Sequence, residues 1–418
     1  MNAAELPGRL ARSARARLAD VRASPAWSPA ALRVAWTARG GGHPADPIHL
    51  PHLADAVDWL CRAQDAAGGG GFARGYSLTW NAYFRASGWQ AAYPETTGYI
   101  IPTFLSAARR LDRPGLAARA LDAARWEIGV QLPSGAVQGG VIGQEPSPAV
   151  FNTGQLILGW LAAWEETGDA AFAEAARRAG RFLAESEEDG RFAKGNSQYA
   201  RGDATAYNVR AAWGLAEAGT LLGEPAFTDA AARVLRAVAG TQHADGWFPD
   251  CCLYDPHRPL LHTLAYTVRG LLEGGRVLGD DLLVRQAELS ARRLAERVRE
   301  DGWMSGRYAR GWAESASWSC VTGQAQMATN WLRLHEITCA AEWIEPAGRS
   351  LAFVKRTQDR GSSTGDGVRG GIPGSWPVGG DYGRYEMLNW AAKFFADSLM
   401  RHDAATSPAE HPPVSRLA

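Results

Sequence analysis

The sequence is poor in cysteine, with five among 418 residues, and these five have no regular spacing. An odd and irregular set is not the disulfide framework of a small secreted domain. Neither charge sign is in excess, because 44 basic residues meet 44 acidic ones. A balanced charge argues against the basic surface of a nucleic-acid-binding protein, so we expect no nucleic-acid partner.

Long apolar runs are also missing, since none reaches the roughly 18 residues of a membrane-spanning helix. The segment 1–45 is rich in Ala and Arg but lacks the apolar core of a secretory signal. We therefore expect a cytoplasmic protein without a membrane span. Residues 1–45 are expected to form an extension that is partly disordered. Residues 403–418, rich in Pro, Ser and Ala, are expected to be a disordered tail.

What the chain has instead is an internal repeat. Six times an amphipathic helical pattern ends and a Gly-rich element follows, as in Gln-His-Ala-Asp-Gly-Trp at 242–247. The markers of these repeats are Gln64, Gln131, Glu187, Gln242, Glu300 and Gln358. They follow one another at steps of 67, 56, 55, 58 and 58 residues, which is room for two helices and their connections.

The two helical patterns of each repeat differ in where their apolar residues lie. The first carries one apolar stripe, as at Leu53, Val57 and Leu60, whereas the second is apolar nearly all round, as over 264–272. Six outer and six buried inner helices of this kind predict an all-α, (α/α)6 toroid over residues 46–402. Turns from inner to outer helices are short and the return loops are long, so we expect function at the long-loop face.

The inner helices begin at this same face, and their first residues are the candidate catalytic groups. Glu95 has two interpretations, a first-turn acid that stabilises its helix or a carboxylate directed into the cavity. We predict catalytic roles for Glu95, Asp203, His262 and Tyr207. His262 can equally be a hydrogen-bonded structural residue at the start of a buried helix.

Polar and aromatic residues at the helix starts and in the long loops are predicted to bind substrate, because aromatic faces stack on sugar rings and polar groups orient them. The predicted set is Trp89, Tyr93, Tyr99, Asn152, Gln155, Asn208, Arg269, Gln324, Trp376, Tyr385, Asn389 and Lys393. No cofactor and no metal are expected. A zinc site of Asp250, Cys252 and His262 is the less favoured alternative, because no paired Cys motif supports it.

Several stretches carry a resemblance to known families. The segments 93–103, 150–155, 262–273, 374–377 and 388–397 resemble a family of bacterial proteins encoded with exopolysaccharide biosynthesis genes. The Gln-x-x-Asp-Gly-Trp element and the repeat period look, more distantly, like the squalene-cyclase and prenyltransferase toroids. (α/α)6 glycosidases and lyases share this scaffold. The resemblance implies a toroid and work on glycans.

The favoured interpretation is an enzyme that acts on a saccharide or glycoconjugate by glycoside hydrolysis, with Glu95 as a catalytic carboxylate. A polysaccharide lyase or uronyl C5-epimerase, a terpenoid cyclase-like enzyme and a glycan-binding protein are the alternatives. The cyclase alternative lacks the Asp-x-Asp-Asp and Asp-Asp-x-x-Asp motifs of that chemistry. Two ionisable groups meeting in the cavity would favour an enzyme, whereas walls of aromatics and amides alone would favour a binding protein.

Overall fold

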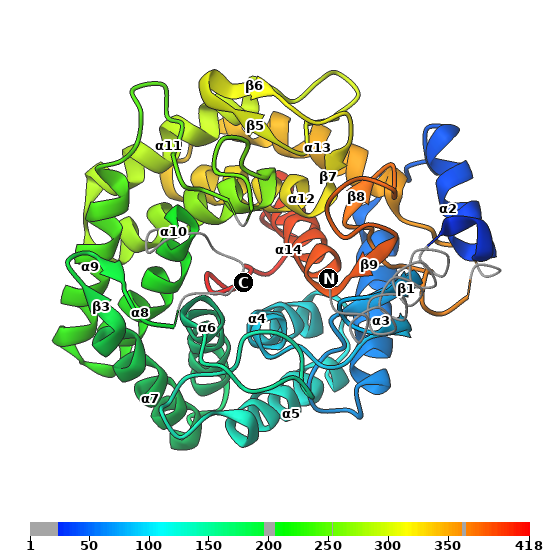
Figure 1. The fold of residues 1–418 in the computed structure, drawn as a ribbon. Coiled ribbons are helices and arrows are strands. Elements are labelled where there is room, and N and C mark those ends of the chain that lie inside the picture. The colour runs from blue at the N-terminus through cyan, green and yellow to red at the C-terminus, as the bar shows by residue number, and fades with distance from the viewer. Residues whose placement is uncertain (1–23, 196–204, 253, 362–364) are drawn as a thin grey trace, which may run out of the picture.

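The computed structural model describes residues 24–195, 205–252, 254–361 and 365–418. Within these residues an inner ring and an outer ring of helices form a closed double ring (Figure 1). The inner helices are α4 (Pro94–Arg110), α6 (Val150–Thr167), α8 (Val209–Leu222), α10 (Leu261–Leu278), α12 (Val321–Thr338) and α14 (Asn389–Thr406). The outer helices are α3 (His49–Ala66), α5 (Gly115–Val130), α7 (Ala170–Ser186), α9 (Pro225–Ala239), α11 (Asp281–Ala295) and α13 (Ile344–Thr357). Each inner helix packs on the next and α14 returns to α4, which confirms the predicted (α/α)6 toroid.

Close contact between inner helices explains the glycines in their apolar sequences. A Cβ added to Gly154 of α6 would lie 2.4 Å from the Cα of Ala211 on α8. A Cβ added to Gly214 would lie 2.4 Å from the carbonyl oxygen of Gly154. The helical cost of these glycines, about 1 kcal/mol each relative to alanine, is therefore offset by tighter helix packing.

The recurring glutamine has a structural task. The side-chain amide of Gln131 donates to the carbonyl of Gly135 in its own Gly-rich turn and to that of Ala175 on the next outer helix. Gln242 repeats the arrangement with Gly246 and Gln286. The four glutamine markers therefore join their Gly-rich turns to the neighbouring outer helix.

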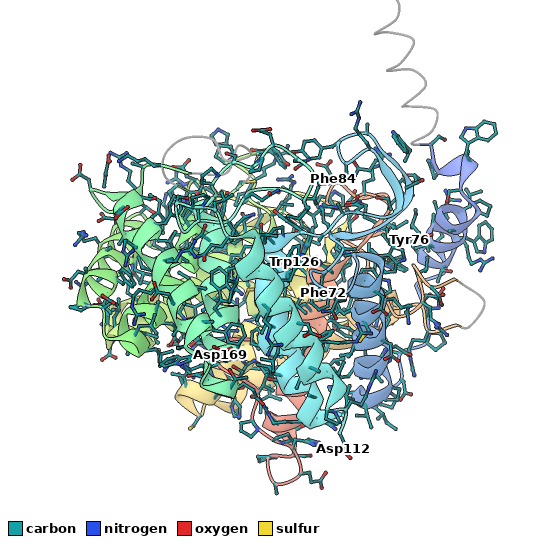
Figure 2. All side chains as sticks on the ribbon, turned by 90° about the horizontal axis from the view of Figure 1, so that it is seen from below. Phe72, Tyr76, Phe84, Asp112, Trp126 and Asp169 are labelled. Atoms are coloured by element: carbon teal, nitrogen blue, oxygen red, sulfur yellow. The ribbon has the colours of Figure 1, made fainter. Side chains whose placement is uncertain are left out.

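The two faces of the ring differ as the loop lengths predict. Figure 2 labels Phe84, in the long loop before α4, at one end of the molecule, and Asp112 and Asp169, in short turns, at the other. The long loops also contain small strands that the sequence interpretation does not include. A sheet of order β2-β1-β9 joins β2 (Ala86–Trp89), β1 (Gly75–Asn81) and β9 (Glu386–Leu388), and so links the first and last long loops.

Three short pairs complete the loop structure. They are β3 (Glu187–Glu188) with β4 (Arg191–Phe192), β5 (Tyr308–Ala309) with β6 (Ala313–Glu314), and β7 (Ser319–Cys320) with β8 (Ser375–Trp376). Within 24–45, the 3-10 turn η2 (Pro25–Trp27) and helix α2 (Pro29–Arg39) lie beside the ring (Figure 1). None of the described helices combines the length and apolar character needed to cross a bilayer.

The end of the chain contacts the centre of the short-turn face (Figure 1). Leu417 and Ala418 are buried, and Arg269 of α10 donates to the backbone carbonyl of Ala418 at 2.8 Å. Arg401 of α14 donates to the carbonyl of Ser415. The structure therefore places 403–406 in α14 and gives Ser415 and Ala418 specific partners, whereas the sequence predicts a disordered tail over 403–418.

Candidate active site

Glu95 lies in the first turn of α4, at the long-loop end of the ring, and is half-buried. Its Oε2 accepts a hydrogen bond of 2.6 Å from the Tyr93 hydroxyl. Burial raises the pKa of Glu95 to about 7, although Tyr93, Arg210 and Arg74 oppose the rise. A carboxyl group that is about half protonated at neutral pH can donate or accept a proton.

Aromatic side chains gather around Glu95 from several inner helices. The Phe151 ring of α6 lies 5.3 Å from that of Tyr207 in the 3-10 turn η3 (Ala206–Asn208) and 5.0 Å from that of Tyr266 on α10. The Tyr99 ring, one turn below Glu95, lies 5.5 Å from that of Phe394 on α14. Burial raises the pKa of Tyr207 and Tyr266, and the nearby Glu95 raises both further, so these phenols stay protonated.

Arg210 of α8 brings a positive charge into this aromatic wall. Its side chain is 2% exposed, and its guanidinium carbon lies 5.0 Å from the Tyr266 ring centre and 5.5 Å from that of Phe394. Nε donates to the Gln155 side-chain oxygen at 2.7 Å. Within the described part of the chain no carboxylate forms an ion pair with Arg210, and its Nη2 has no hydrogen-bond partner. Arg210 can therefore stabilise the ionised form of Glu95.

A second cation, Arg74, lies in the first long loop, directly before β1. Its guanidinium carbon lies 4.1 Å from the Phe84 ring centre and 4.9 Å from that of Trp390. Nη1 donates to Glu386 at 3.0 Å and to Gln90 at 2.8 Å. Burial opposes ionisation of Glu386, yet Arg74 and neutral donors hold its pKa below the ordinary value. Arg74 is therefore fixed in a charged pair beside the Glu95 region.

His262, in the first turn of α10, also faces the aromatic wall. Its ring lies 4.4 Å from that of Tyr266 and 5.1 Å from that of Tyr382. Burial lowers its pKa to about 3, although a 2.8 Å contact between Nδ1 and the Gln326 side-chain oxygen opposes the shift. The imidazole is therefore neutral at physiological pH, and so low a pKa makes it a weak base, which fits a positioning role better than proton abstraction.

Four further predicted residues lie near this wall. Tyr93 bonds Glu95, and Asn152 is within hydrogen-bonding reach of Tyr93 while donating to the carbonyl of Gln138. Gln155 holds Arg210, and Asn208 is buried beside Tyr207. The predicted aromatic and amide groups thus meet from α4, α6 and η3.

Lys393 lies deeper on α14. Its Nζ is 2.5 Å from Asp397 Oδ2, both side chains are fully buried, and the Phe394 ring centre lies 4.3 Å away. Burial lowers the pKa of Lys393 to about 7, and Asp397 opposes the shift. This pair forms a charged layer below the aromatic wall.

Three other predicted residues have structural partners other than Glu95. The Trp89 ring packs on Trp59 of the outer helix α3 at 5.1 Å. Gln324 bonds Ser319 and the carbonyl of Gly302. Asn389 donates to the carbonyl of Ala73 and to Thr96. The amides of Gln324 and Asn389 thus satisfy hydrogen-bonding groups of loops and helix starts, and the Trp89 ring packs on an outer helix. These are the alternative, structural roles of such residues.

The last three predicted binding residues are dispersed. Arg269 pairs with Glu273 and contacts the end of the chain at the opposite face. Trp376 is buried in β8, and Tyr385 lines a pocket of about 500 Å³ at the rim. Asp203 lies outside the described residues, and no group of metal-ligating side chains forms among those described, Asp250, Cys252 and His262 included.

Several site residues escape the sequence prediction. Arg210 has a usable signal, because it is a single cation in the otherwise apolar start of a buried helix. Arg74 and Glu386 have none, since they are brought together only by the pairing of β1 with β9. Trp390 and Phe394 lie on α14, and the sequence does not distinguish aromatic residues of this helix that face the site from those that fill the core.

No family model matches the chain, and no curated protein matches it in sequence. Solved structures share its fold. An unsaturated glucuronyl hydrolase from Bacillus sp. GL1 is similar with a TM-score of 0.66 at 13% identity, covering 85% of this chain and 96% of that one. A cellobiose 2-epimerase from Bacillus thermoamylovorans gives 0.65 at 11%, covering 84% and 98%. An alpha-amylase from Clostridium perfringens gives 0.62 at 12%, covering 85% and 98%. At such identities the likeness is one of fold.

Proposed function

We propose that this protein is a carbohydrate-active enzyme that hydrolyses a glycosidic bond in a saccharide or glycoconjugate, with Glu95 as the general acid. The observation that carries the proposal is the half-buried Glu95, whose pKa is about 7, above a wall of aromatic side chains. Raising the pKa of a carboxyl group by burial is how a glycosidase keeps an acid protonated near neutrality. The wall offers ring faces on which a sugar can stack.

The reaction needs a second group that directs water. We propose Asp203, because it precedes Tyr207 by four residues and Tyr207 belongs to the aromatic wall. Glu95 would give its proton to the glycosidic oxygen as the bond to the anomeric carbon breaks. Water would add its oxygen to that carbon and pass a proton to the second carboxylate. His262 and Tyr207 would orient the sugar.

The cation in the wall argues against terpenoid cyclisation. Arg210 places its guanidinium within 6.0 Å of the Tyr99 ring centre and closer to those of Tyr266 and Phe394. A carbocation held by the same rings would be repelled by this charge in a medium of low dielectric constant. The positive charge that develops on the sugar during hydrolysis would be offset by the proposed second carboxylate.

A mass-spectrometric activity screen against oligosaccharides, uronate-containing ones included, tests the proposal. We expect cleavage with addition of water, and a loss of about 100-fold or more in the Glu95→Gln variant. Glu127→Gln is the matched control, because Glu127 is a fully buried carboxyl group on the outer helix α5 whose pKa burial raises well above its ordinary value.

Other products would contradict hydrolysis. Loss of water from the product would indicate a lyase, and an isomer of unchanged mass an epimerase such as the cellobiose 2-epimerase that shares the fold. Binding without conversion, equal in both variants, would indicate a glycan-binding protein.

We further propose that the enzyme works in the cytoplasm of a bacterium, in polysaccharide or glycoside metabolism. Its five cysteines are all free thiols, which suits a reducing compartment. The resemblance of 93–103 and 262–273 to proteins encoded with exopolysaccharide genes supports the metabolic setting.

A further inference from the structure

Arg74 is held rigidly although only one of its nitrogens is engaged. Its side chain is 12% exposed, lies against the Phe84 and Trp390 rings, and is paired with Glu386, which is 4% exposed. Glu386 is itself held by Ser77, Asn81 and Gln90. A guanidinium fixed in this way loses little conformational entropy when it binds a ligand.

The remaining edge of this guanidinium is available. Its hydrogen bonds to Gln90 and Glu386 both come from Nη1. Nη2 and Nε donate to none of the described residues, and neither atom is fully enclosed. The Trp390 ring lies 4.9 Å from the Arg74 guanidinium carbon and 6.3 Å from the Tyr93 ring centre, and the Tyr93 hydroxyl donates to Glu95, so Arg74 lies on the same side of the aromatic wall as Glu95. Two parallel N–H groups on one edge match the geometry of a carboxylate.

The balance of charged side chains around Glu95 allows an anion to bind there. Among the described residues, Arg74 is balanced by Glu386 and Lys393 by Asp397, whereas Arg210 pairs with no carboxylate. When Glu95 carries its proton, the charge of Arg210 therefore has no counter-charge among the described residues, and only the proposed Asp203 would offset it. A bound anion would place a further negative charge near Arg210 and the free edge of Arg74 in the same protonation state in which Glu95 can act as an acid.

We infer that Arg74 anchors an anion subsite beside Glu95, and that the saccharide entering this site carries an acidic group, a uronate carboxylate. The inference rests on the proposed function for the identity of the ligand as a saccharide. Phe84 and Trp390 would flank the bound sugar, and the free edge of Arg74 would receive its carboxylate.

Binding to the inactive Glu95→Gln variant tests the subsite without requiring turnover. The probes are uronate-containing oligosaccharides and the same oligosaccharides after chemical reduction of their carboxyl groups, so that each pair differs only in the exchange of a carboxylate for a neutral hydroxymethyl group. We expect calorimetry to show at least about tenfold tighter binding of the acidic member. Otherwise neutral oligosaccharides that carry a sulfate ester form a third arm, and we expect them to bind more weakly because a sulfate ester is a weaker hydrogen-bond acceptor than a carboxylate.

The variants must not leave one charge of the buried Arg74–Glu386 pair alone, because removal of Arg74 by itself would leave the negative charge of Glu386 uncompensated. We therefore combine Arg74→Gln with Glu386→Gln, which removes both charges together, and compare it with Arg74→Lys, which keeps the charge but loses the fork. The double variant should abolish the preference for acidic probes, and Arg74→Lys should weaken it. Arg384→Gln, a loss of an exposed arginine on the rim, should leave the preference unchanged.

Equal binding of acidic and reduced probes, or equal weakening of both by the double variant, would overturn the subsite. These failures are separable from failure of the proposed function. Cleavage of neutral saccharides with no acidic preference would leave hydrolysis standing without the subsite. Selective binding of uronates without cleavage by the wild-type protein would leave the subsite standing without hydrolysis.

Discussion

Glu95 is subject to two opposing influences. A helix N-terminus lowers the pKa of a first-turn carboxyl group, whereas burial raises it. Burial dominates here, and no described backbone N–H donates to the carboxylate, whose partner is the Tyr93 hydroxyl. From the sequence alone both interpretations of Glu95 remain open, because burial at a helix start depends on loops that pack over it.

The raised pKa of Glu95 predicts a dependence of stability on pH. A carboxyl group whose pKa rises from 4.5 to about 7 on folding stabilises the fold below pH 4.5, and this contribution is lost as the pH rises through 7. The Glu95→Gln variant should therefore gain stability relative to wild type between pH 4.5 and pH 8, by roughly 3 kcal/mol. Urea unfolding at both pH values measures the difference. A difference that stays constant with pH would show that Glu95 has an ordinary pKa.

Removal of the Tyr93 hydroxyl should raise the pKa of Glu95 further. The phenol stabilises the ionised form, so Tyr93→Phe should move the alkaline limb of the pH–rate profile upward by about 1 pH unit. Tyr308→Phe is the control, because its hydroxyl accepts from the Ser305 backbone in a separate loop. Coincident profiles for Tyr93→Phe and wild type would exclude Tyr93 as a partner of the acid.

At the level of helices, the sequence predicts what depends on periodicity and loop length. The all-round apolar pattern of 264–272 identifies α10 as an inner helix, and the structure buries it on every side. The sheet that joins β1 to β9 could not be predicted, because Tyr76 and Met387 pair across almost the whole chain. Arg74 and Glu386 depend on that pairing, so this part of the site could not be predicted either.

Close helix packing makes Gly154 sensitive to a single methyl group. An added Cβ would lie 2.4 Å from the Ala211 Cα, so Gly154→Ala should lower the free energy of unfolding by about 1–3 kcal/mol. Gly129 on α5 has no atom within 4 Å of an added Cβ, so Gly129→Ala should raise it by up to about 1 kcal/mol. Equal effects of the two substitutions in chemical denaturation would mean that α6 and α8 are not in close contact.

In the whole molecule, closure of the ring brings the starts of the inner helices together at one face. Glu95 and Tyr266 lie on different repeats, yet both face the same aromatic wall. The charged layer of Lys393 and Asp397 lies below it, and the contact of Arg269 with Ala418 lies at the opposite face. The spacing of the repeats predicts that the inner helices begin at one face, but it does not predict which side chains point inward. The Trp89 ring points outward and the Arg210 guanidinium inward.

The central claim is that Glu95 gives a proton to the leaving group. It is tested most directly by comparing Glu95→Gln with wild type on two glycosides of the sugar identified by the activity screen. In one the leaving group is a hydroxyl group of a second sugar, and in the other it is 2,4-dinitrophenolate, which leaves without protonation. General acid catalysis requires a loss of about 100-fold or more for the first and little loss for the second. Equal losses for both glycosides would contradict the assignment of Glu95 as the acid.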